Sequence, residues 1–282
     1  MIQIGLPPLK CRVYSIISSE ALVKGTRSRG VQMSGHSHWA GIKHKKAAND
    51  AKRGKVWSKL ARFIIVAARR GGGDPSANLA LRYAIDKAKA ANMPKDTIEK
   101  AVKKGTGDLG GENYEEVVYE GYGPGGVAIM VEALTNNRHR TAPEMKKVFE
   151  RHGGSMGAAG CVGWMFSKKG LITVGAAGIN EDELMEIALG AGAEDMKTNG
   201  DVFEITCEPA AFESIKKTLE EKNIPMNVAE IAMLPKNTVT IADPETARKI
   251  VNLMEAIEDH DDAQNAYSNF DIPPEVMAKV SS

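Results

Sequence analysis

Residues 170–235 alternate between strand patterns and helix patterns. Strands are predicted over residues 171–174, 194–198, 201–207 and 227–234, and helices over residues 181–190 and 210–222. The order is therefore β-α-β-β-α-β, which is the ferredoxin-like split arrangement. Because such a unit can stand alone, we expect residues 170–235 to fold as a domain of their own.

Elements on both sides of this unit predict a second sheet. Before it, we expect strands over 115–121 and 127–134, a helix from a capping Thr141 to about His152, and a strand over Cys161–Phe166. After it, we expect a strand or link over Asn237–Ile241, a helix over Pro244–Asp259 and a final strand over Ala263–Phe270. These later elements can return to the sheet begun at Glu115. That places an α/β domain at residues 111–169 plus 236–282, with residues 170–235 inserted.

The string GYGPGG, Gly121 to Gly126, satisfies the pattern G-x-G-x-x-G. A dinucleotide fingerprint opens a helix after a strand, whereas here a strand follows and a proline lies in the loop. We therefore predict a hairpin turn.

Charge is divided unequally along the 282 residues, which are enough for two or three domains. Residues 33–110 carry 17 Lys and Arg against 6 Asp and Glu, a net charge of +11, whereas residues 111–282 carry 15 against 29, a net charge of −14. A basic block joined to acidic domains is typical of a part that meets phosphate.

The basic block is predicted to be a three-helix domain, which makes the whole chain α+β with three domains. Residues 49–70 have helical period, entered at Asn49 or Asp50 and stopped by glycines. Asp74-Pro75 is expected to open a second helix, to about Asn92, and Met93-Pro94 a third, ending at Gly105. On the first helix, one arc is apolar (Val56, Leu60, Phe63, Ile64 and Ala67) and the adjoining arc is cationic (Lys52, Lys55, Lys59, Arg62 and Arg69).

The segment before this helix is also basic and carries histidines and a tryptophan. The candidate nucleic-acid-binding residues are His36, His38, Trp39, Lys43, His44, Lys45, Lys46, Lys52, Arg53, Lys55, Lys59, Arg62, Arg69, Arg138 and Arg140. A solvated surface, or a flexible arm with a packed tryptophan, remains an alternative. Three imidazoles without a nearby thiolate or carboxylate argue against a metal site, and we expect no cofactor.

Arg138 and Arg140 precede the expected helix at Thr141, where they can bind an anion or pair with local acids such as Glu144. The acidic run Glu255–Asp262 (EAIEDHDD) lacks calcium-loop spacing. We interpret it as a solvated helix end, with a contact to a basic protein as the alternative.

The run MSGHSHWAGIKHKKAANDAKRGKVWSKLARFIIVAARRGGGDPSANLALRYAIDKAKAANMPKDTIEKAVKKG resembles the N-terminal domain of the YebC/PmpR family. The likeness continues through YEGYGPGG, TNNRHRTAPEMKK and GWMFSKKG, and covers the chain after Met33. It implies a three-domain α/β protein of the bacterial cytoplasm that regulates transcription by binding DNA; mitochondrial relatives activate translation. It also implies that Lys43, Lys45, Lys46, Lys52, Arg53, Lys55 and Lys59 touch nucleic acid.

Two functions follow from these patterns, and an enzyme is not expected because no nucleophile, base and orienting group recur in a motif. The first is a DNA-binding transcriptional regulator, and the alternative is a ribosome-associated translation factor that binds ribosomal RNA or mRNA. We expect a monomer in the cytoplasm with no membrane partner. Residues 1–32 are a misassigned start, a disordered tail or a transit peptide, and the last would make the protein organellar.

Overall fold

The structure, a computed structural model, describes residues 50–107 and 113–280, with backbone alone at residues 50–53. Three helices come first in the described part: α2 (Asp50–Gly71), α3 (Leu79–Ala90) and α4 (Lys95–Thr106). Their shared core contains Ile64, Leu81 and Ile98. At Gly105 of α4, an added Cβ would lie 2.6 Å from the Cβ of Ala68, so the two helices cross where neither carries a large side chain.

The predicted start of the second helix is wrong. Asp74 does not open it, because its carboxylate accepts hydrogen bonds from the backbone and the hydroxyl of Ser76 and closes a turn. The capping residue is Asn78, whose Oδ1 accepts from the N–H of Leu81. On α2 the packed arc is also shifted, because Val56 is exposed while Ile65, Val66 and Ala68 are buried.

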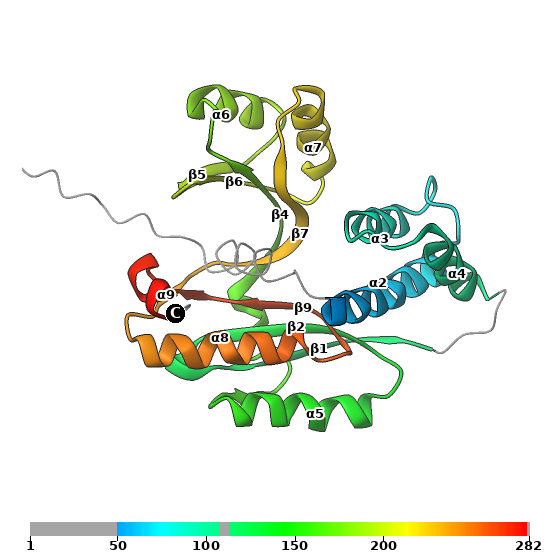
Figure 1. The fold of residues 1–282 in the computed structure, drawn as a ribbon, viewed down its shortest axis with the longest axis vertical. Helices are drawn as coiled ribbons and strands as arrows, with labels where there is room; N and C mark the ends of the chain where they lie inside the picture. Colours follow the sequence, from blue (N-terminus) through cyan, green and yellow to red (C-terminus); the bar gives the residue numbers. More distant parts are fainter. Residues whose placement is uncertain (1–49, 108–112, 281–282) are drawn as a thin grey trace, which may run out of the picture. The chain divides into compact units, whose positions relative to one another are not determined.

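A four-stranded sheet in the order β3-β1-β2-β9 follows. Its strands are β1 (Glu115–Tyr122), β2 (Ala128–Thr135), β3 (Ser155–Met156) and β9 (Ala263–Ser268). Helices α5 (Arg138–Arg151) and α8 (Pro244–Glu258) cover one face of it (Figure 1), where Phe149 and Leu253 are fully buried. The pairing of β9 with β2 confirms that the chain returns to the first sheet.

The predicted hairpin at GYGPGG is confirmed. Strands β1 and β2 pair in antiparallel register from Glu115 with Thr135 to Tyr122 with Ala128. A short 3-10 turn over Pro124–Gly126 joins them. Gly125 and Gly126 have φ of 73° and 76°, a backbone region that favours glycine.

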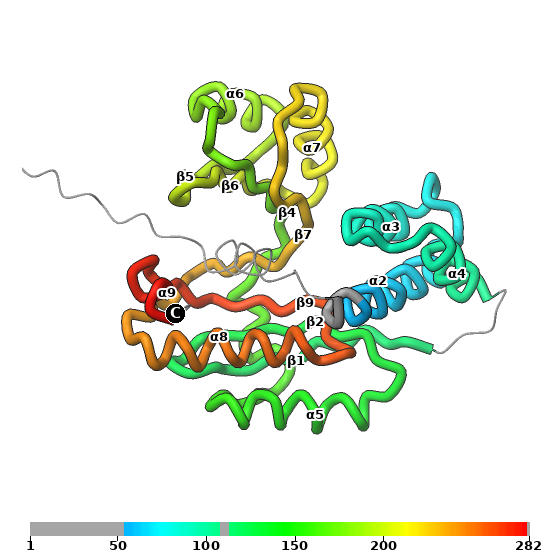
Figure 2. Tube along the Cα trace, in the orientation of Figure 1, coloured from blue at the N-terminus to red at the C-terminus, as the bar shows by residue number. Residues whose placement is uncertain are grey.

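A second four-stranded sheet has the order β5-β6-β4-β7. Its elements are β4 (Phe166–Gly175), α6 (Glu181–Gly190), β5 (Asp195–Asn199), β6 (Val202–Cys207), α7 (Phe212–Glu221) and β7 (Met226–Pro235). All its neighbouring strands are antiparallel, so the predicted β-α-β-β-α-β arrangement is confirmed. The tube in Figure 2 shows β4 and β7 running together toward the first sheet. The domain boundaries themselves stay a prediction.

Two local predictions in the first sheet region are wrong. Helix α5 begins at Arg138, and its cap is Asn137, whose Oδ1 accepts from the N–H of Arg140. Cys161–Phe166 is not a strand: a 3-10 turn spans Gly163–Met165, and β4 begins at Phe166. The strand predicted over Asn237–Ile241 is present as β8 (Val239–Thr240). Sequence reasoning missed its pairing with β10 (Phe270–Asp271) and the helix α9 (Pro274–Val280).

Candidate nucleic-acid interface

Much of the predicted site lies outside the described residues. His36, His38, Trp39, Lys43, His44, Lys45 and Lys46 precede residue 50, and the side chains of Lys52 and Arg53 are not described. The described members are Lys55, Lys59, Arg62, Arg69, Arg138 and Arg140. Their surroundings decide what the α2 face can do.

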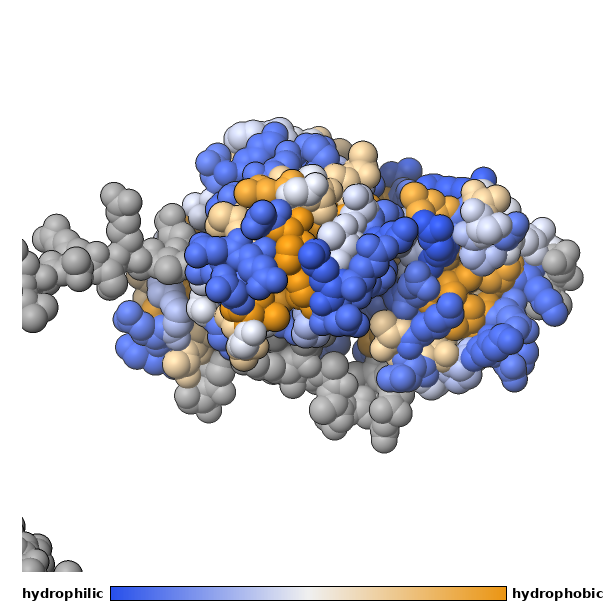
Figure 3. All heavy atoms as spheres, turned by 90° about the horizontal axis from the view of Figure 1, so that it is seen from above, coloured by the Kyte–Doolittle hydropathy of each residue, from blue (hydrophilic) through white to orange (hydrophobic). Residues whose placement is uncertain are grey.

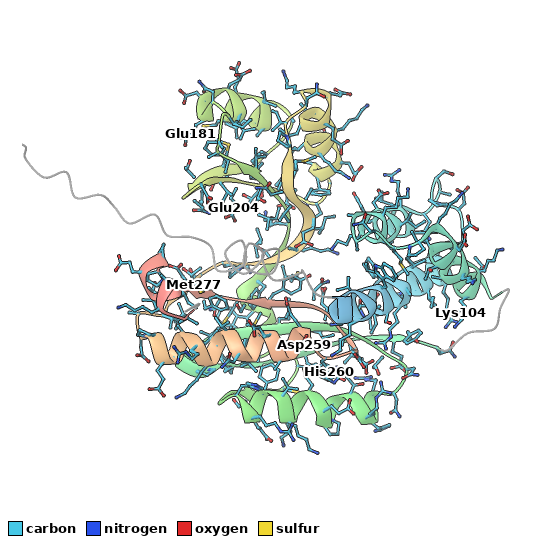
Figure 4. The ribbon with its side chains drawn as sticks, viewed as in Figure 1. Lys104, Glu181, Glu204, Asp259, His260 and Met277 are labelled. Atoms are coloured by element: carbon cyan, nitrogen blue, oxygen red, sulfur yellow. The ribbon has the colours of Figure 1, made fainter. Side chains whose placement is uncertain are left out.

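The cationic side of α2 contacts the end of α8 and the residues that follow it. Lys55 Nζ lies 3.5 Å from the carbonyl oxygen of Asp259, and Lys59 Nζ donates to the carbonyl oxygen of Glu258. Figure 4 labels Asp259 at this end of α8, near α2. The last carbonyl groups of a helix have no intrahelical partner and carry partial negative charge, so the two ammonium groups stabilise this end.

Arg62 continues the same contact one turn along α2. Its guanidinium donates to the carbonyl oxygen of Asp261 and lies 3.0 Å from Oδ1 of Asp262. It also lies over the ring of Tyr114, with 5.9 Å from Cζ to the ring centroid. The α2 cations therefore bind an oxygen-rich segment of this chain, Glu258–Asp262, which we call the acidic loop.

Asp262 is the centre of the contact and is 2% exposed. Its Oδ2 accepts from Nη2 of Arg140 at 2.6 Å and from Oγ1 of Thr141 at 2.7 Å. Burial acts to raise the pKa of this carboxyl, but the bonds from Thr141 and Arg140 and the charges of Arg140 and Arg62 hold the pKa below its ordinary value. The carboxylate is therefore charged and fully partnered.

This network corrects the prediction of a solvated acidic helix end at Glu255–Asp262. Helix α8 does end there, but Asp262 is buried, and Nε2 of His260 lies 3.3 Å from Oε2 of Glu144. The predicted alternative for the arginines, pairing with local acids, is what the structure contains. Arg140 Nε lies 3.8 Å from Glu144 as well as binding Asp262, and Arg138 lies 4.0 Å from Glu115.

The other end of α2 and helix α4 carry exposed cations. Arg69 Nη1 lies 2.6 Å from Oδ1 of Asn113. Lys100, Lys103 and Lys104 on α4 are exposed, and no ion pair joins them to a carboxylate within residues 50–107 and 113–280. Lys104 is labelled in Figure 4. Sequence reasoning did not select these three lysines, although their i, i+3, i+4 spacing places them on one helix face.

Helix α3 contacts strand β7 of the second sheet through charge and helix α7 through ring packing. Lys87 Nζ lies 2.9 Å from Oε2 of Glu230 on β7. The rings of Tyr83 and Phe212 pack edge to face with centroids 6.2 Å apart. These side chains of α3 are therefore engaged within the chain.

Comparisons with known proteins place the chain in a family. A model described as the TACO1/YebC protein N-terminal domain matches residues 37–108, and a model described as the TACO1/YebC second and third domain matches residues 114–270. This chain belongs to the TACO1/YebC family. The predicted family is confirmed, as is the α+β class.

Relatives within the family are close over nearly their whole length. Proteins named "probable transcriptional regulatory protein" from Halothermothrix orenii and Natranaerobius thermophilus are both 53% identical, covering 88% and 87% of this chain and 99% of each relative. A crystal structure of a conserved hypothetical protein from Aquifex aeolicus matches with a TM-score of 0.76 and 51% identity, over 85% of this chain and 99% of that one.

The described residues contain neither a metal cluster nor a membrane-spanning helix. No group of three or more His, Cys, Asp or Glu side chains there could hold a metal ion. No helix in the same residues is long and apolar enough to cross a membrane.

Proposed function

We propose that this protein regulates transcription by binding DNA through its basic N-terminal helical domain. The names of its relatives support a role in transcriptional regulation. The main observation that supports DNA binding is the charge of residues 33–110. Their net charge is +11, whereas the net charge of residues 111–282 is −14.

The cations of α2 and α4 support phosphate as the ligand of this domain, with Lys55, Lys59 and Arg62 exchanging the acidic loop for it when they bind. Lys55, Lys59 and Arg62 bind carbonyl and carboxylate oxygens of the acidic loop, which are the same kind of acceptor as phosphate oxygens. The exposed lysines of α4 add further cations. Phosphate contacts of this kind give affinity and position, whereas base contacts give sequence selectivity.

A second candidate function is binding of ribosomal RNA or mRNA in a translation factor. One observation favours it: Arg62, the described arginine in the middle of α2, is held by Asp262, so it does not act as a free base-reading side chain there. Recognition dominated by phosphate suits an RNA surface as well as a DNA duplex.

The test is fluorescence anisotropy of a labelled duplex at several salt concentrations, with purified ribosomes as competitor. One variant changes Lys52, Lys55 and Lys59 to Ala. A matched control changes three exposed lysines of the second sheet unit, Lys197, Lys217 and Lys222, to Ala, which removes the same charge elsewhere. We expect the α2 variant to lose affinity and to flatten the salt dependence by about 0.9 per lost phosphate contact, and the control to do neither.

Ribosomes then separate the two candidates. If they do not displace the protein from DNA at similar concentration, the DNA regulator stands. If ribosomes displace the protein at a concentration far below that of the duplex, counted in nucleotides, translation is the primary role. Equal losses in the α2 variant and the control would refute a specific contact through this domain.

A further inference from the structure

We propose that Trp164, with the cations next to it, binds an unpaired base of single-stranded nucleic acid. This site lies between β3 and β4, in the part of the chain matched by the second and third domain of the family. It is separate from the basic N-terminal domain, so it goes beyond the function proposed above and does not depend on it.

The turn that carries Trp164 is held by a buried carboxylate. Glu120 on β1 is 7% exposed, and its oxygens accept from the backbone N–H of Gly160, Val162 and Gly163 at 2.7–2.8 Å. Burial acts to raise the pKa of Glu120, but these three N–H groups hold the pKa below its ordinary value. A charged, fully partnered carboxylate therefore fixes the residues just before Trp164.

Trp164 itself is fixed and yet exposed. Its Nε1–H donates to the carbonyl oxygen of Cys161 at 3.1 Å, and that oxygen also accepts from the hydroxyl of Tyr122 at 3.2 Å. The indole N–H is thus satisfied inside the protein, while the residue remains 64% exposed. Most tryptophans are largely buried, so this exposure is unusual. An exposed ring whose N–H is already bonded offers its apolar face to a ligand. Trp57, by comparison, is partly buried, and its indole N–H donates to the carbonyl oxygen of Ala91 at the end of α3.

The cations around Trp164 select the class of ligand. Lys236, at the end of β7, donates from Nζ to the carbonyl oxygen of Trp164 at 2.9 Å, and exposed Lys168 follows on β4. Residues 151–180 contain no Asp or Glu, although residues 111–282 carry a net charge of −14. Lys169 in this stretch is paired with Glu194 and Glu208, so the cations that matter here are the exposed Lys168 and Lys236. An exposed aromatic ring with lysines next to it is complementary to a base and its phosphate. An apolar protein partner has no need of this charge.

The hydropathy surface in Figure 3 shows apolar patches that lie among hydrophilic side chains. Leu189 on α6 is 48% exposed, in a helix with four carboxylates (Glu181, Asp182, Glu183 and Glu186), which would repel phosphate. Leu189→Ala is therefore a matched control, because it removes exposed apolar surface from a helix that carries carboxylates and no cation.

The experiment measures anisotropy of labelled 12-nucleotide oligouridylate and oligothymidylate with the full chain. We expect Trp164→Ala to weaken binding about 5- to 150-fold, the usual range for losing one stacked base, and Trp164→Phe to keep most of the affinity. Leu189→Ala should bind like the wild type. Binding of both oligomers indicates recognition of the base, whereas binding of oligouridylate alone indicates that the ribose also contributes.

A second readout does not depend on truncating the side chain. With Trp39 and Trp57 changed to Phe, Trp164 is the one tryptophan left of three, and stacking should quench its emission as oligomer is added. The proposal is overturned if the wild type binds neither oligomer, if Trp164→Ala binds both as tightly as the wild type, or if emission does not change on binding. Duplex binding is expected to be unaffected by Trp164→Ala, because paired bases cannot stack on the ring. Failure of the duplex contact would thus leave this result intact.

Discussion

Replacing Asp262 with Asn tests the buried network beneath the acidic loop. The change keeps the shape of the side chain but removes the charge that Arg62 and Arg140 share. Breaking a buried ion pair by removing one partner costs about 3–5 kcal/mol, and each hydrogen bond to a charged group contributes about 1.5–3 kcal/mol. The two arginine side chains are 22% and 46% exposed, so water can rehydrate them. We therefore expect the free energy of unfolding to fall by about 2–4 kcal/mol.

The assay is urea unfolding at pH 7 followed by circular dichroism. Asp261→Asn is the control, because Asp261 is exposed and contributes its backbone carbonyl, not its carboxylate, to Arg62. We expect a lower urea midpoint for Asp262→Asn and no shift for the control. Equal midpoints for the wild type and Asp262→Asn would refute the reasoning.

The stability difference between the wild type and Asp262→Asn should depend on pH in one direction. The folded-state pKa of Asp262 lies below the ordinary value of 3.8, so its stabilising contribution is present above that pH and is lost as the pH falls through the lower folded-state pKa. The difference in unfolding free energy between wild type and Asp262→Asn should therefore narrow below pH 3.8. A difference that is constant from pH 7 into this acid range would contradict a charged Asp262.

Three further changes test other contacts. Glu120→Gln replaces an acceptor of three N–H groups, so we expect the free energy of unfolding in urea to fall by about 2–3 kcal/mol and the emission of Trp164 to change. An unaltered emission would contradict the claim that Glu120 fixes the turn before Trp164. Asn78→Ala removes the α3 cap and two bonds to backbone carbonyls, and should cost about 1–3 kcal/mol in the same assay, with faster hydrogen exchange in α3. Gly105→Ala should cost about 1–3 kcal/mol, because its Cβ would meet Ala68 at 2.6 Å; a stability equal to the wild type would mean that α4 moves freely.

The elements with a regular hydrophobic period were predictable from the sequence. The order β-α-β-β-α-β and the hairpin at Gly121–Gly126 needed local patterns alone. Helix starts were less predictable where two capping residues compete. Thr141 matches a capping box, but Asn137 lies four residues earlier and caps first, which leaves the hydroxyl of Thr141 to bind Asp262.

The contacts of the candidate site were not predictable, because they join residues far apart in sequence. Arg62 and Asp262 are 200 residues apart, and no local period relates them. Glu120 shows the same limit: its position on β1 says nothing of the turn at Gly160–Gly163 that it holds. From sequence alone, a run of charged residues predicts a face exposed to solvent. The buried contacts of Asp262 contradict that prediction, but they can be seen only in the tertiary structure.

The salt dependence of duplex binding measures how many of the α2 lysines reach phosphate. If Lys52, Lys55 and Lys59 all reach phosphate, their joint replacement by Ala should reduce the slope of log K against log salt by about 2.7, at about 0.9 per contact. Lys55 and Lys59 both contact carbonyl oxygens at the end of α8, and if both stay there the reduction falls to about 0.9, from Lys52 alone. The larger value would mean that DNA takes Lys55 and Lys59 from the end of α8. The smaller value would mean that the α2 cations are divided, with Lys55, Lys59 and Arg62 packing the acidic loop while Lys52 binds phosphate.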